Sequence, residues 1–316
     1  MGAMTDDTPD NLDSPESGYG TERGPAPEAL IQPSEQTDMF GIPTPPWRAF
    51  PRRIPHLGHV ALFFVIALVL IGLSQAAGVW ALHYFLPHTS TARLLRLSAT
   101  DARASIPIQA FAYGLIALVC VPIFSLLWQE PFGEGVHWNN RSGWGNFTRL
   151  VILGLAVGVA VSFFGNFLPM PENPPITRDM MKSAAGAWAM LVFGLTAAPL
   201  IEELAFRGFL LPGLINAFRW FADRGILPAS APKWIGIPFS IPVTSLAFAF
   251  MHSPQVSHAW GPLLLIGLVS VVLCVVRLAM NSVMASVLVH AAYNFTLFAG
   301  VLYQTSGFRH LERLTG

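Results

Sequence analysis

The first long apolar stretch of the chain, residues 60–85, reads VALFFVIALVLIGLSQAAGVWALHYF and contains no Asp, Glu, Lys or Arg. About 20 apolar residues are enough to cross the hydrocarbon core of a bilayer as an α-helix. Inside lipid the backbone must satisfy its own hydrogen bonds, and a single segment does so only as a helix. The stretch therefore predicts a membrane-spanning helix.

Six more apolar stretches follow and predict further spanning helices. They cover residues 106–128, 147–168, 184–215, 237–251, 260–278 and 283–303. The fourth is long enough for Pro199 and Pro212 to divide it, and Pro238 and Pro242 shorten or bend the fifth. We therefore expect an all-α, polytopic transmembrane helical bundle of about seven spans, with six to eight as the range.

The composition supports a membrane protein and argues against a water-soluble domain. Hydrophobic residues make up 53% of the chain and charged residues only 11%, whereas an ordinary soluble domain carries about 25% charged residues. The formal net charge is zero, so there is no electrostatic basis for binding nucleic acid. Cys120 and Cys274 both lie inside apolar runs and are expected to be small core residues, with no disulfide framework.

The segments before, between and after the motifs differ in character. The acidic, Pro-rich beginning lacks the apolar content to fold and is expected to be a disordered tail; it starts acidic, unlike a signal peptide. The divisions are a tail at 1–46, N-terminal transmembrane helices without a motif at 47–180, a core rich in polar motifs at 181–305 and a short C-terminal tail at 306–316. Gly154 and Gly158 are four residues apart in the third span and suggest a helix-contact face.

The orientation is signalled by basic residues at the start of the first span. Arg48, Arg52 and Arg53 directly precede it, which favours a cytoplasmic N-terminus. We expect an integral protein of a bacterial cytoplasmic membrane.

Two carboxylates and a guanidinium stand in the fourth apolar stretch. An ionisable group within a span costs about 2.5–3.5 kcal/mol or more and is a functional hypothesis by default. Glu203 and Arg207 are four residues apart and share a helix face, whereas Glu202 is turned about 100° away. A carboxylate in a dry site suits a general base. Taken alone, the Glu203–Arg207 pair is equally well explained as an ion pair that locks helix packing.

Further polar groups lie in the fifth and seventh stretches. His252 ends the fifth, and His290 and Asn294 are four residues apart in the seventh. Both side chains of that second pair can donate hydrogen bonds to the oxyanion of a tetrahedral intermediate. A single histidine in a helix is more often a core residue with satisfied hydrogen bonds. The occurrence of all three patterns in separate helices favours a site.

These three elements resemble the CAAX protease and bacteriocin-processing family of glutamic-type intramembrane endopeptidases. The family pattern is Glu-Glu-x-x-x-Arg, then Phe-x-x-x-His, then His-x-x-x-Asn. In this chain the elements read EELAFR at 202–207, FAFMH at 248–252 and HAAYN at 290–294. Every defining position matches, and the resemblance covers residues 184–303. It identifies 181–305 as a catalytic intramembrane protease core.

The resemblance implies a role for each matching residue and a type of partner. Glu202 would act as general base on a water that His252 helps to hold, with Phe248 packed beside it. The pair Glu203 and Arg207 would orient the site, and the pair His290 and Asn294 would form the oxyanion hole. The implied partner is a peptide or protein substrate that reaches the lipid bilayer, and no metal or other cofactor is implied.

Two alternatives stay open. The first is a non-catalytic membrane partner, or a protein of the bacteriocin-immunity type, that keeps the motifs as a polar core. The second is a zinc-dependent membrane protease, because two histidines and a glutamate are zinc ligands, although the chain has no His-Glu-x-x-His sequence.

Overall fold

The computed structural model describes residues 53–172, 174–180 and 182–314. The tail expected at 1–46 and the last two residues, 315–316, lie outside the described residues. Every regular element within the described ranges is a helix, which confirms the all-α class.

Seven helical segments are long and apolar enough to cross a membrane, which confirms the expected number for the part of the chain that the structure describes. They are α1 (Leu57–Phe85), α3 (Ala102–Trp128), α6 (Phe147–Gly165), the composite segment Ala184–Asp223, the composite segment Pro232–Met251, α12 (Trp260–Met280) and α13 (Val283–Gln304). The expected and observed ends agree within about four residues for five of them.

The fourth segment is a chain of four helical pieces and not one regular helix. They are α8 (Ala184–Leu195), α9 (Ala197–Glu203), the π-helix η2 (Leu204–Leu210) and α10 (Leu211–Asp223). The break falls at Thr196, with φ −124° and ψ −86°. Pro199 lacks the N–H that would bond the carbonyl of Leu195, so the α-helix cannot continue regularly here. The segment extends to Asp223, eight residues beyond the expected end at 215.

The fifth segment begins earlier than the sequence suggests. A π-helix, η3 (Pro232–Gly236), leads directly into α11 (Ile237–Met251). Pro238 lies in the first turn of α11, directly after η3, and Pro242 is accommodated within the helix.

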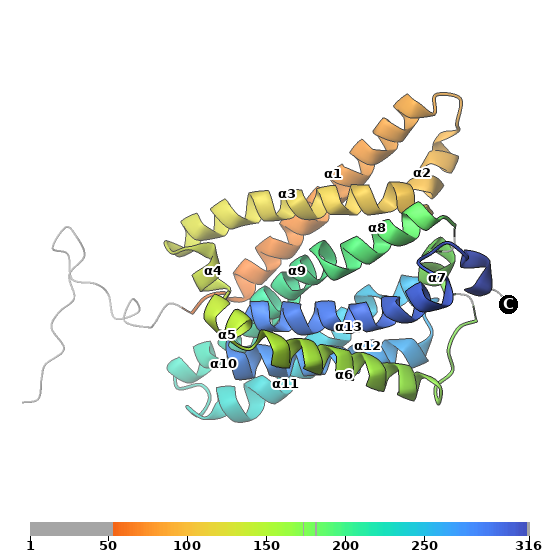
Figure 1. The fold of residues 1–316 in the computed structure, drawn as a ribbon. Helices are drawn as coiled ribbons and strands as arrows, with labels where there is room; N and C mark the ends of the chain where they lie inside the picture. Colours follow the sequence, from red (N-terminus) through yellow and green to blue (C-terminus); the bar gives the residue numbers. More distant parts are fainter. Residues whose placement is uncertain (1–52, 173, 181, 315–316) are drawn as a thin grey trace, which may run out of the picture. The chain divides into compact units, whose positions relative to one another are not determined.

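Shorter helices connect the spans. They are α2 (Thr91–Thr100), α4 (Phe132–Gly135), α5 (Asn140–Gly145), α7 (Pro175–Met180), and the 3₁₀ turns η4 (Ser253–Val256) and η5 (Leu311–Leu314). Figure 1 shows α4, α5 and α10 at one end of the spans and α2, α7 and the C-terminal turn at the other.

The helix α13 lies in the middle of the helical array and packs closely against α6 (Figure 1). A Cβ atom at Gly154 would lie 2.4 Å from the carbonyl oxygen of Val289, and one at Gly158 would lie 2.5 Å from Cβ of Thr296. The glycine contact face predicted for the third span is therefore confirmed. This contact fixes the helix that carries His290 and Asn294.

The N-terminal spans pack aromatic side chains against η2. The rings of Phe63 on α1 and Phe209 on η2 stack with their centroids 4.4 Å apart. Phe124 and Trp128 of α3 lie 4.7 Å and 5.7 Å from the same ring of Phe209. All four side chains are buried. The motif-free half of the chain therefore supports the π-helix that follows the two glutamates.

Candidate active site

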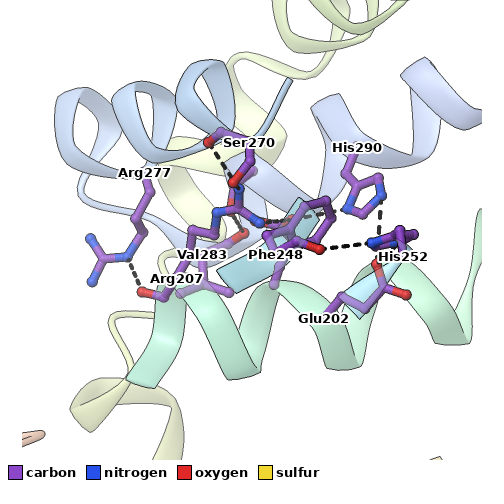
Figure 2. A network of polar contacts seen from close by, with 10 residues as sticks. Glu202, Arg207, Phe248, His252, Ser270, Arg277, Val283 and His290 are labelled. Atoms are coloured by element: carbon purple, nitrogen blue, oxygen red, sulfur yellow. Dashed lines mark hydrogen bonds and ion pairs between the residues drawn. The ribbon is translucent and has the colours of Figure 1, made fainter. Parts of the chain in front are cut away.

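The three sequence motifs meet inside the helical array (Figure 2). Glu202 lies near the end of α9, His252 immediately follows α11, and His290 lies on α13. Oε2 of Glu202 is 3.8 Å from Nε2 of His252 and 3.8 Å from Nε2 of His290. The side chain of Glu202 keeps 12% of its surface exposed. Two imidazole edges and one carboxylate thus face one another.

Glu203 and Arg207 form an ion pair with both side chains fully buried. Nη1 of Arg207 donates to Oε1 of Glu203 at 2.8 Å. Nη2 of Arg207 also donates to the hydroxyl of Ser270 at 2.6 Å and to its carbonyl at 2.9 Å. The guanidinium lies 4.7 Å from the centroid of the Phe248 ring. The buried charge of Glu203 is therefore neutralised by a partner that is itself held from α12.

A second arginine reinforces the same region and was missed in the sequence. Arg277 of α12 is buried, and its Nε donates to the backbone carbonyl of Arg207 at 3.1 Å (Figure 2). Its Nη1 donates to Asn281 at 3.2 Å. The available signal was a single arginine near the end of an apolar run, but basic residues at span ends are common and point to no partner.

Hydrogen bonds fix which nitrogen of each histidine carries a proton. Nδ1 of His252 lies 2.9 Å from the carbonyl oxygen of Phe248, and Nδ1 of His290 lies 2.9 Å from Oε1 of Glu203. Carbonyl and carboxylate oxygens only accept, so Nδ1 is the donor in both rings. When neutral, each histidine then presents a bare Nε2 toward Glu202. Three acceptors converge, an arrangement suited to a water or a proton between them.

Phe248 forms an apolar wall beside the two imidazoles. Its ring centroid is 4.7 Å from that of His252 and 5.8 Å from that of His290. The side chain is buried. The wall limits hydration on that side of the imidazoles.

Asn294 is placed differently from the other motif residues. Its Nδ2 donates at 2.8 Å to the carbonyl of Gly194 on α8, in the last turn before the break at Thr196. One of its two amide hydrogens is therefore used to fasten the broken helix to α13. The amide has a second hydrogen.

The N-terminal half also contributes a side chain near Glu202. Tyr113 of α3 packs its ring 5.4 Å from that of Phe193, and its hydroxyl is near enough to Glu202 for an electrostatic interaction. A lone tyrosine within a span carries no sequence signal for such a position, because the contact depends on how α3 packs against α8 and α9.

The charges of the site leave one carboxylate uncompensated. Glu203 and Arg207 cancel each other, so Glu202 retains a net negative charge beside two imidazoles when both are neutral. In the described ranges, no three His, Cys, Asp or Glu side chains are grouped closely enough to hold a metal ion. The arrangement can take a proton from a water and can stabilise an imidazolium.

Comparison with known proteins identifies one family. Residues 184–296 match the family model of the type II CAAX prenyl endopeptidase, Rce1-like. No curated protein and no solved structure matches the chain. The matched segment contains all seven candidate residues, and together with the seven spans it supports an integral membrane protease of the CAAX type that acts on protein substrates in a lipid bilayer. Residues 184–296 are therefore similar to the Rce1-like type II CAAX prenyl endopeptidase domain, which is consistent with the CAAX protease and bacteriocin-processing family.

Proposed function

We propose that the chain is a glutamic intramembrane endopeptidase in which Glu202 and His252 activate a water. The observation that carries the proposal is the 3.8 Å separation between Oε2 of Glu202 and Nε2 of His252. A water bonded to both atoms at about 2.8 Å fits beside that line. The same water then has acceptors for both of its hydrogens.

The chemical steps follow from these donors and acceptors. Glu202 takes a proton from the water as the water oxygen attacks the scissile carbonyl carbon. The carbonyl oxygen becomes an oxyanion, and the second amide hydrogen of Asn294 is a donor for it. When the peptide C–N bond breaks, Glu202 passes its proton to the leaving amine. The products are one carboxylic acid, which keeps the second proton of the water, and one amine.

His290 is proposed to act as the second oxyanion donor in its doubly protonated form. Its Nδ1 donates to Glu203, so Nε2 becomes a donor only when the ring is an imidazolium. The carboxylates of Glu203 and Glu202 lie on its two sides, at 2.9 Å from Nδ1 and 3.8 Å from Nε2. With His290 protonated, the charges of Glu202, Glu203, Arg207 and His290 sum to zero.

Glu203 and Arg207 are positioning residues, because both are buried away from the Glu202 carboxylate. Phe248 excludes water behind the imidazoles. The catalytic core is proposed to extend over 181–305, with the N-terminus of the chain in the cytoplasm of a bacterial cell.

The deciding experiment compares Glu202→Gln and His252→Gln with wild type in cleavage of a fluorogenic CAAX peptide, prenylated and unprenylated. The matched control is Glu172→Gln, an exposed carboxylate outside the spans. Loss of a general base lowers turnover by about 10²–10⁴-fold, with the melting temperature unchanged. Retained activity within tenfold in folded Glu202→Gln would remove Glu202 from the role of base.

Chelation separates this mechanism from a zinc-dependent one. Exhaustive chelation is expected to leave turnover unchanged. Loss of activity that stoichiometric zinc restores would instead make Glu202 and the histidines metal ligands. Failure of folded wild-type protein to cleave any peptide would favour the non-catalytic alternative.

A further inference from the structure

A basic pocket lies at the end of the spans where α10 turns into η3, away from the three motifs. Its volume is about 310 Å³, and Arg53, Arg219, Asp223 and Lys233 line it. Arg53 lies four residues before α1, Asp223 ends the fourth span, and Lys233 lies in the first turn of the fifth. The pocket is therefore at the level where the chain enters and leaves the apolar layer.

The pocket lining carries more positive than negative charge, with three cations and one carboxylate. Arg53 and Asp223 form a bidentate ion pair at 2.7 Å and 2.8 Å and neutralise each other. Arg219 donates to the neutral amide oxygen of Asn216 at 3.1 Å. Lys233 lies 5.1 Å from the ring centroid of Trp234. Among the described residues, neither Arg219 nor Lys233 forms an ion pair, which leaves two positive charges in excess.

The surface around the pocket is apolar and aromatic, and much of it is exposed. Trp220 is 46% exposed and Trp234 is 70% exposed, and Phe221, Ile226, Ile235 and Phe239 are exposed beside them. The guanidinium of Arg224 lies 3.7 Å from the ring centroid of Trp220. Tryptophan with basic residues at a span end is typical of the membrane–water interface. A ligand of this pocket therefore meets cations on one side and an apolar surface on the other.

We propose that this pocket binds the phosphate group of an anionic phospholipid, whose acyl chains lie along the exposed apolar side chains of α10, η3 and α11. Arg219 offers paired N–H donors, and Lys233 offers a compact charge, the two modes in which proteins hold phosphate. Basic pockets between spanning helices bind anionic headgroups. A free phosphate ion has the same headgroup chemistry but cannot use the apolar surround, so the surround favours the lipid.

The chain offers a matched control for this pocket. A second cavity of about 280 Å³ lies between residues 144 and 149 and contains a single cation, Arg149. Figure 1 shows α5, next to this cavity, at the same end of the spans as α10. Removal of Arg149 changes the net charge of that end without touching the proposed site.

The experiment uses full-length protein in nanodiscs of mixed phosphatidylglycerol and phosphatidylcholine, followed by detergent extraction and mass spectrometry of the lipids that stay bound. Wild type and Arg149→Gln are expected to retain phosphatidylglycerol selectively. Arg219→Gln with Lys233→Gln is expected to reduce that selectivity by about tenfold or more, and Lys233→Gln alone by less. Unchanged selectivity in the double variant would overturn the proposal.

Two further arms distinguish other ligands. Phosphatidylglycerol is expected to raise the melting temperature of wild type, whereas inorganic phosphate at equal concentration is expected to leave it unchanged. An equal rise in melting temperature with inorganic phosphate would identify a site for a free anion and would overturn the proposal of a lipid ligand. A raised KM for peptide in the double variant, with lipid retention unchanged, would identify a peptide site instead. Lipid retention and the shift in melting temperature need no proteolysis, so the lipid proposal stands or falls separately from the proposed function.

Discussion

Two adjacent glutamates are surrounded by two different environments. We call Glu203, Arg207 and Ser270 the ion-pair region, and Glu202, His252 and Asn294 the Glu202 region. In the first, buried partners hold Oε1 of Glu203 at 2.8–2.9 Å. In the second, Oε2 of Glu202 lies 3.8 Å from Nε2 of His252 and 3.8 Å from Nε2 of His290. Glu203 is held in place by short hydrogen bonds to Oε1, whereas Glu202 faces two imidazoles across a gap wide enough for a water. The neighbours, and not the residue type, separate the two roles.

The largest effect is expected from Arg207→Ala, which removes one partner of the buried pair. It leaves Glu203 charged and unpaired, at a cost of about 3–5 kcal/mol. The melting temperature in detergent and the turnover should fall together. In the same two measurements, Glu202→Ala should lose turnover, while its melting temperature should equal or exceed that of wild type. If Arg207→Ala is fully stable while Glu202→Ala unfolds, the two regions have been assigned in reverse.

A smaller loss is expected from Gly154→Ala, which pushes α6 away from α13. The new Cβ would meet the carbonyl of Val289 at 2.4 Å, and overpacking of this kind costs about 1–3 kcal/mol. Because α13 carries His290, which touches both regions, stability and turnover should both decline. The control is Gly114→Ala on α3, where a Cβ meets nothing within 4 Å. Equal melting temperatures for the two variants would show that α6 does not position α13.

Asn294→Ala tests whether the Glu202 region also contributes to stability. The loss of one hydrogen bond to Gly194 should cost about 1 kcal/mol. If the second amide hydrogen serves the oxyanion, kcat should fall by about 10²-fold or more, far beyond what the stability change explains. A kcat within threefold of wild type, measured on folded protein, would restrict Asn294 to fastening α8.

The smallest effect concerns His137, which lies outside the spans and outside both regions. Burial, reinforced by the charge of Arg277, lowers the pKa of its imidazole. The unfolded chain then takes up a proton first as the pH falls through about 6.5, so the contribution of His137 to stability is complete above that pH and is lost below it. His137→Asn, chosen because φ is +58°, should show a flatter acid limb in melting temperature than wild type. If the melting temperatures of the variant and wild type fall in parallel as the pH is lowered, His137 does not contribute to the acid sensitivity of the fold.

The sequence was sufficient to predict the spans and most of the candidate residues, for physical reasons. A run such as 60–85 has one stable conformation in lipid, the α-helix. Ionisable groups such as Glu203 and Arg207 are costly to place within a span, so their presence there indicates a function. The break at Thr196 was only partly predictable. Pro199 removes one backbone hydrogen bond, but it does not determine the backbone conformation at Thr196 or the angle between α8 and α9. The two π-helices carry no local signal.

Contacts between distant helices account for what the sequence could not provide. Ser270 is a single serine in an apolar run, a pattern that predicts no partner. In the structure its hydroxyl accepts a hydrogen bond from Arg207, 63 residues away in the sequence. Arg277 and Tyr113 matter only because of what they face. The bond of Asn294 to Gly194 depends on a carbonyl near a helix break, which no pattern of residues in α13 encodes.

The π-helix η2 has a consequence for the phase of the fourth span. Each residue of an α-helix turns the chain by about 100°, and a π-helical segment holds more residues per turn than an α-helix does. Because η2 turns the chain by less per residue, winding 204–210 as a regular α-helix of the same length would rotate Arg219 relative to Glu202. The π-helix thus acts as a spacer that sets the rotational register between the carboxylates at one level of the membrane and the basic pocket at another.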